Sequence, residues 1–128
     1  MKENTREIKF RGLDLNNEWH YGSVILCNED ISSTIINDTR EAQVSTNSIS
    51  QYTGLKDKNG VDIYEGDIVE WKVKDRGEIL SQIEILKFKN GSFILECPKY
   101  NCEESVYEDT ESLTEESSVI GNIYQNKG

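Results

Sequence analysis

The sequence predicts an all-β fold built from short antiparallel strands. Apolar and polar residues alternate over short segments, which is the period of a half-buried strand. The segments are separated by turns that rely on Gly and Asn, since the chain has nine Gly and a single Pro. No long segment keeps a helical period. At 128 residues the chain can form one domain, or two small subdomains that share a core.

Two segments near the beginning of the chain are predicted to form a hairpin. "REIKFRG" (6–12) alternates apolar and charged residues, which indicates a half-buried strand. "WHYGSVILC" (19–27) is a denser apolar run, which is typical of a strand buried on both faces. Asn16 and Asn17 lie between them and favour a turn. Two further short strands are expected at 34–36 and 42–44.

The segment "IEILKFKNGSFILEC" (83–97) carries the strongest hairpin pattern. Its Asn-Gly pair at 90–91 suits a type I′ turn, because both residues tolerate a positive φ. The cross-strand pairs expected from that turn are Phe88 with Phe93 and Leu86 with Leu95. Ile83 and Ile85 have the opposite parity, so we expect a bulge or burial on both faces there. The segment 118–125 is expected to close the chain as a last strand.

The stretch "QYTGLKDKNGVDIYEGDIVEW" (51–71) concentrates turn residues and invites comparison with ligand-binding loops. Aligning Gly60 with the glycine of an EF-hand loop puts Leu55, which has no side-chain oxygen, at the first ligand position. The spacing of a phosphate-binding Walker loop is also missing. We therefore predict a turn at 59–60 and a bend at 65–67. The strand that follows should point its alternate apolar residues into a core, namely Val69, Trp71 and Val73.

The net charge of −10 is concentrated in one segment. Residues 103–116 carry seven acidic groups and no basic one. A protein with this charge is repelled by nucleic-acid backbones, which disfavours direct nucleic-acid binding. Two patterns of the capping-box type allow one helical turn in this segment, although no apolar stripe supports it.

The residues that could perform chemistry are few and scattered. Three cysteines, an odd number, argue against a disulfide framework, and we expect Cys27 and Cys97 to be small core residues. Cys97 and Cys102 have a spacing that zinc sites tolerate, but His20 and Cys27 do not form a second pair. No nucleophile lies in a recognisable catalytic motif. We therefore expect neither an enzyme nor a cofactor.

The expected compartment is the cytoplasm. No apolar run approaches the length of a membrane helix, and the first six residues lack the apolar core of a secretion signal. An odd cysteine count fits a reducing environment. We expect no association with a membrane.

Several segments together resemble the YopX family of bacteriophage and prophage proteins. They are "REIKFRG", "EWHYGSVIL", "ISQYTGLKDKNGVDIYEGDIVEW" and the closing "VIGNIYQN". The resemblance implies an SH3-like barrel in the C-terminal part, residues 51–128, and a smaller N-terminal β-hairpin subdomain, residues 1–50. It places the protein in the cytoplasm of a bacterial host, and it implies no known activity.

We therefore predict a non-enzymatic phage accessory protein that binds another protein, from the host or the phage, or a second copy of itself. Edges and loops of small β folds suit such binding. The predicted surface combines the two tyrosines beside the turn, with their hydroxyls at the surface, and part of the acidic segment: Tyr52, Tyr64, Glu108, Asp109 and Glu111. One alternative is an acidic DNA mimic that inhibits a host DNA-binding protein. A second alternative is a metal-dependent enzyme.

Overall fold

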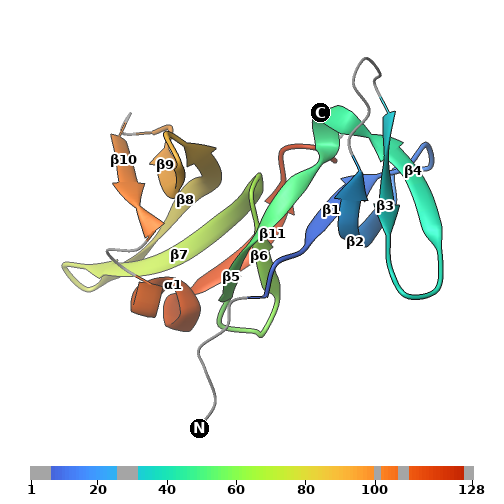
Figure 1. The fold of residues 1–128 in the computed structure, drawn as a ribbon. Helices are drawn as coiled ribbons and strands as arrows, with labels where there is room; N and C mark the ends of the chain where they lie inside the picture. Colours follow the sequence, from blue (N-terminus) through green and yellow to red (C-terminus); the bar gives the residue numbers. More distant parts are fainter. Residues whose placement is uncertain (1–6, 26–31, 100–101, 107–109, 126–128) are drawn as a thin grey trace, which may run out of the picture. The chain divides into compact units, whose positions relative to one another are not determined.

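The computed structural model describes residues 7–25, 32–99, 102–106 and 110–125. The strands in these ranges form two antiparallel sheets, so the all-β prediction is confirmed (Figure 1). The chain divides into two units, Met1–Gly54 and Leu55–Gly128. The boundary predicted from the sequence lay after residue 50. Within the described ranges, no helix has the length and apolar character needed to span a membrane.

The first sheet has the strand order β4-β3-β2-β1-β5-β6. Its strands are β1 (Phe10–Leu13), β2 (Trp19–Ile25), β3 (Ser32–Ile36), β4 (Glu41–Ser45), β5 (Ser50–Lys56) and β6 (Asp62–Tyr64). A short 3-10 helix, η1 (Thr46–Ser48), connects β4 to β5. β5 begins in the first unit and ends in the second.

The predicted N-terminal hairpin is confirmed. β1 pairs with β2 from Phe10–Gly22 to Leu13–Trp19, and Asn17 adopts a φ of 65° in the turn. The two short strands expected downstream lie within β3 and β4. The expected burial of β2 on both faces is wrong, because alternate residues of β2, among them Tyr21, are exposed.

A close approach of two strands shapes the first unit. A Cβ atom on Gly12 in β1 would lie 2.6 Å from Cγ2 of Val44 in β4, although β2 and β3 separate these strands in the sheet. The sheet must therefore curl to bring its first and fourth strands together. Leu13 and Ile35 are buried in the same unit. The Arg11 guanidinium is also buried, and it lies 3.9 Å from the centroid of the Trp19 ring, where a cation–π attraction stabilises the charge.

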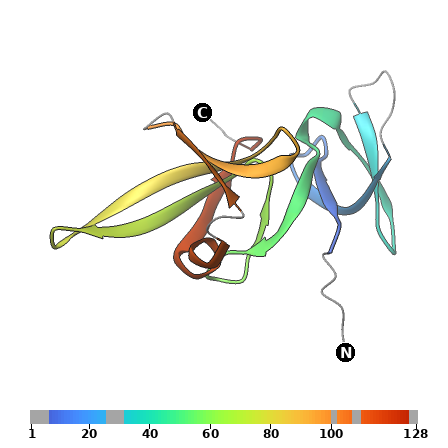
Figure 2. The same cartoon turned by 60° about the vertical axis from the view of Figure 1, so that its left-hand side comes forward.

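The second sheet has the order β10-β9-β8-β7-β11 (Figures 1 and 2). Its elements are β7 (Asp67–Asp75), β8 (Glu78–Lys89), β9 (Ser92–Cys97), β10 (Cys102–Ser105), α1 (Thr110–Glu116) and β11 (Ser117–Asn122). The described strands form an open sheet rather than a closed barrel, and the SH3-like barrel stays a prediction. β11 overlaps the closing strand expected at 118–125, but it begins one position earlier and ends at Asn122.

The register predicted for the 83–97 hairpin is confirmed. Phe88 pairs with Phe93 and Leu86 pairs with Leu95, around a turn in which Asn90 and Gly91 both have positive φ. The pairing of β7 with β8 is continuous, so the bulge considered near Ile83 and Ile85 is absent. Ile83 is 40% exposed, so burial on both faces is wrong as well.

The core of the second unit contains residues from β6, β7, β8, β9 and α1, together with Val106. Its members are Ile63, Val69, Trp71, Leu86, Phe93, Leu95, Val106 and Leu113. The predicted inward orientation of Val69 and Trp71 is confirmed, whereas the side chain of Val73 lies outside the described part. Leu113 is fully buried and anchors α1, which explains how a strongly acidic segment forms a helix without an apolar stripe.

Candidate functional site

The carboxylate of Asp57 organises the turn in the 51–71 stretch. Oδ1 accepts the backbone N–H groups of Asn59 at 2.8 Å and of Val61 at 2.9 Å. Oδ2 accepts the N–H of Val119, 62 positions away, at 2.8 Å. Asp57 is buried, and three backbone donors satisfy it. The predicted turn at 59–60 is confirmed, and the carboxylate that suggested a ligand loop has a structural role.

The bend at 65–67 has a similar structural role. Oδ2 of Asp67 accepts the N–H of Tyr64 at 2.7 Å and closes the bend. The N–H of Gly66 donates to the Leu86 carbonyl at 2.7 Å, and the Gly66 carbonyl accepts the N–H of Ile123 at 2.9 Å. The bend is therefore joined to β8 on one side and to the segment after β11 on the other.

The structure places the predicted surface tyrosines in the interior. Tyr52 is 4% exposed and Tyr64 is 1% exposed, so the expectation that their hydroxyls lie at the surface is wrong. In the first unit, the ammonium of Lys9 lies 4.9 Å from the centroid of the Tyr52 ring and covers it. Glu108 and Asp109 lie outside the described residues, as does the side chain of Glu111. A protein-binding role for these five residues stays a prediction.

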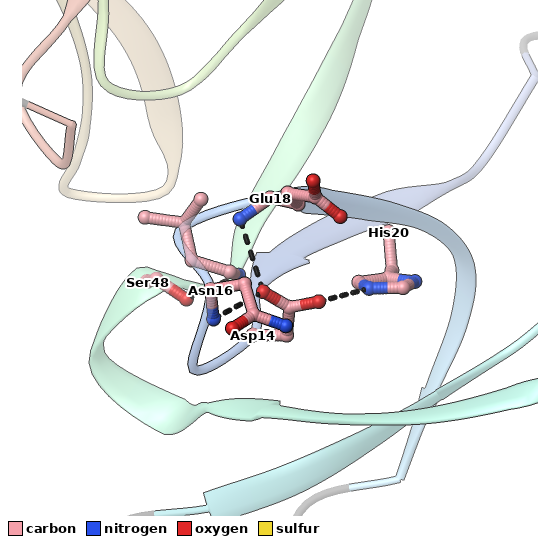
Figure 3. Close-up of polar contacts among 6 residues, drawn as sticks. Asp14, Asn16, Glu18, His20 and Ser48 are labelled. Carbon is pink, nitrogen blue, oxygen red and sulfur yellow. Dashed lines mark hydrogen bonds and ion pairs between the residues drawn. The ribbon is translucent and has the colours of Figure 1, made fainter.

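The β1–β2 turn contains a carboxylate–imidazole pair that the sequence did not indicate (Figure 3). Oδ2 of Asp14 accepts a hydrogen bond from Nε2 of His20 at 2.8 Å. Oδ1 accepts the N–H groups of Asn16 at 2.8 Å and of Glu18 at 3.0 Å. The hydrogen bond from His20 is the main cause that lowers the pKa of Asp14, and the Glu18 N–H is the next. Only the Asp-x-Asn spacing of a turn could have indicated part of this arrangement.

Ser48 lies close to this pair without forming a catalytic relay. Its hydroxyl accepts the N–H of Leu13 at 2.8 Å and donates to the Ser45 carbonyl at 2.7 Å. The proton of Ser48 is therefore directed to a backbone carbonyl rather than to His20. Within the described ranges, the pair formed by Asp14 and His20 fixes the turn and is not joined to a nucleophile.

A cavity of about 670 Å³ opens beside this turn, within the first unit. Its lining residues are Leu13, Asp14, Leu15, Asn16, Ser32, Gln43, Val44, Ser45 and Asn47. Three side-chain amides, those of Asn16, Gln43 and Asn47, make no hydrogen bond to another described residue. Leu13 and Val44 are buried and give the cavity an apolar part. Gln43 and Ser45 belong to β4, which is the last strand at one edge of its sheet.

A family model described as "YopX protein" matches residues 2–128 of the chain. The chain belongs to the YopX family. The crystal structure of protein EF1440 from Enterococcus faecalis is similar to it, with a TM-score of 0.57 and 24% sequence identity over 95% of this chain and 96% of that one. At this identity the likeness shows a shared fold. No curated protein matches the chain.

The described part of this YopX-family chain offers few side chains for catalysis or metal binding. Cys97 is a buried free thiol, whereas Cys27 and the side chain of Cys102 lie outside the described part. The described residues contain no group of three or more His, Cys, Asp or Glu arranged to hold a metal ion. The amide-lined cavity is therefore a site, within the described part of the chain, whose side chains are available to a ligand.

Proposed function

We propose that this YopX-family chain is a non-enzymatic accessory protein of a phage or prophage, which binds an extended segment of another protein in the bacterial cytoplasm. The amide-lined cavity carries this proposal. A side-chain amide has both donors and an acceptor, so it can bond to the N–H and C=O groups of a peptide backbone. Asn16, Gln43 and Asn47 supply three such amides around one opening.

The position of the cavity at a sheet edge supports an extended ligand. Among the described strands, β4 has a neighbour, β3, on only one side. An edge strand can bind a peptide as an additional strand, with main-chain hydrogen bonds for affinity and pockets for alternate side chains. Leu13 and Val44 would contact an apolar side chain of such a peptide. The exposed Leu15 adds an apolar contact at the same opening.

The hydrogen bonds made by three buried carboxylates support the non-enzymatic part of the proposal. Asp57 and Asp67 each bind backbone N–H groups, and Glu84 accepts the indole N–H of Trp71 at 3.0 Å. A general base needs a proton within reach on a substrate or nucleophile. The bonds of these carboxylates serve the fold.

A capture experiment tests the cavity. The double variant Gln43→Ala/Asn47→Ala should bind phage and host proteins from a bacterial lysate at least about tenfold more weakly than the wild type, since two backbone contacts are lost. The control Asp38→Ala/Lys58→Ala truncates two exposed side chains away from the cavity and should bind as the wild type does. Equal capture by both double variants, with unchanged folding, would contradict the proposal.

The acidic mimic is the second candidate, and it rests on a different observation. Glu115 and Glu116 are exposed, and the last turn of α1 contains no basic residue that would neutralise them. Binding to a basic host protein would then weaken steeply with salt, because exposed charges are screened. Replacing both residues with Gln should abolish that binding. Salt-independent capture would rule this candidate out.

A further inference from the structure

Asp14 is the charged residue among the described residues that line the amide-lined cavity, and the others are apolar, amide or hydroxyl residues. A carboxylate offers about four acceptor positions. Three donors bind that of Asp14, namely the N–H groups of Asn16 and Glu18 and Nε2 of His20 (Figure 3). A neutral His20 donates this bond without cancelling the negative charge, and Glu18 is a second, exposed acid in the same turn. The charge of Asp14 and part of its acceptor capacity are therefore left for a ligand.

The cations in the described part of the first unit do not neutralise this charge. Lys9 and Arg11 each lie over an aromatic ring, at 4.9 Å and 3.9 Å from the ring centroids. Arg40 precedes β4 at the end away from η1. The acids Asp38 and Glu41 flank Arg40 in the sequence, so this end of β4 is not basic either. None of these three cations lines the cavity.

The cavity combines this negative charge with an apolar wall formed by Leu13 and Val44. A long side chain with an apolar stem and a cationic head matches both parts, because such side chains lay their methylene groups along apolar surfaces. Arginine suits the lining better than lysine, since its planar head carries five N–H donors. The acceptors around the opening are the Asp14 carboxylate, three amide carbonyls and the hydroxyls of Ser32 and Ser45.

We propose that the extended segment bound at β4 carries an arginine whose side chain enters the amide-lined cavity and whose guanidinium binds Asp14. Leu13 and Val44 then contact the methylene groups of this side chain. The inference rests on the proposed function, because it names the side chain that the bound segment places in the cavity.

The charge of the whole chain favours the same kind of partner. The net charge of −10 attracts a basic segment from solution and repels an acidic one. At the cavity itself, an acidic side chain would face the carboxylate of Asp14, and this like-charge contact rejects it. Long-range attraction and the local lining therefore select the same partner, a basic extended segment.

Selection from a displayed library of random heptapeptides tests the chemistry of the partner. The library is first depleted on Gln43→Ala/Asn47→Ala and then selected on the full wild-type chain, so that the retained peptides need the cavity. We expect an arginine at one fixed position of these peptides. Retained peptides without a fixed arginine would overturn this inference and leave the proposed function standing. A selection that retains no peptide would overturn the proposed function, and this inference with it.

Calorimetry with one retained peptide assigns the arginine to Asp14. The peptide carries either arginine or the uncharged citrulline at the fixed position, and the wild type should bind the arginine form about tenfold more tightly or better. Asp14→Asn keeps an acceptor oxygen for its turn but should bring this ratio close to one. The control Asp38→Asn removes the same charge from an exposed position before β4 and should keep the ratio.

Asn47→Lys tests the same charge while Asp14 and its turn stay in place. It adds a cation to the cavity lining, so the preference for arginine should be lost here too. Circular dichroism and the thermal midpoint of each variant should match those of the wild type. A preference for arginine that survives both Asp14→Asn and Asn47→Lys would contradict binding at this carboxylate, and so would a preference that Asp38→Asn reduces as strongly as Asp14→Asn does.

Discussion

Gly66 lies in close contact with the ring of Tyr124. A Cβ atom on Gly66 would lie 2.3 Å from Cε2 of Tyr124, and the backbone there has a φ of +91°. Glycine is required for both reasons, since a side chain would clash with the ring and would favour another conformation. The bend before β7 and the segment after β11 are held together through this contact and the hydrogen bond between Gly66 and Ile123.

Gly66→Ala should lower the free energy of unfolding by about 2–4 kcal/mol, because the new side chain would both clash with the ring and disfavour the positive φ. Gly60→Ala is the matched control. Gly60 also has a positive φ, of 82°, but a Cβ atom there meets nothing within 4 Å. It should cost about 1 kcal/mol. Urea unfolding of the two variants measures the difference. Equal losses would show that the ring of Tyr124 does not constrain this position.

Asp57→Ala should destabilise the second unit by about 2–4 kcal/mol, because it leaves three backbone N–H groups without their acceptor. Asp57→Asn keeps one acceptor oxygen and should cost less. The control Asp62→Ala breaks the exposed ion pair with Lys56 and should cost no more than about 1 kcal/mol. Thermal unfolding measures all three. A cost for Asp57→Ala as small as that of Asp62→Ala would contradict a structural role.

Glu84→Ala should cost about 1–3 kcal/mol, because the indole N–H of Trp71 would lose its acceptor in a buried position. Glu84→Gln retains an oxygen acceptor and should be affected less. The near-ultraviolet circular dichroism of Trp71 reports on the packing around the ring. An unchanged spectrum and stability in Glu84→Ala would contradict this assignment.

The pair formed by Asp14 and His20 predicts a dependence of stability on acid. The folded-state pKa of Asp14 is lowered from its ordinary 3.8 by the hydrogen bond from His20. Asp14 therefore contributes stability that is present above pH 3.8 and is lost as the pH falls through its lower folded-state pKa. His20→Ala should move the pKa of Asp14 back toward 3.8, which carboxyl NMR titration measures. An unchanged pKa would show that His20 is not the cause.

Local patterns in the sequence determined most strands and the register of one hairpin. The Asn90–Gly91 turn fixed the pairing of residues 85–89 with residues 92–96, because a two-residue loop allows a single register. The turn at 59–60 followed equally from its residue types. These features depend on neighbours within a few positions, so the sequence alone contains them.

The tertiary structure decided which of these residues face a core and which remain available. Tyr52 and Tyr64 flank a turn in the sequence, yet both are buried. The His20 ring, which had no partner in the sequence, is bound by Asp14 across the β1–β2 turn. The side-chain direction at a turn depends on how the chain packs around it, which residue type alone does not specify.

The candidate site was beyond the reach of the sequence for the same physical reason. The amide-lined cavity is lined by residues from Leu13 to Asn47, which the fold brings together from β1, β3, β4 and the segments beside them. The sequence by itself determined the strands, the turns and the family. Contacts between distant segments decided that the carboxylates of the 51–71 stretch stabilise the fold. They also decided which other surfaces remain available to a partner.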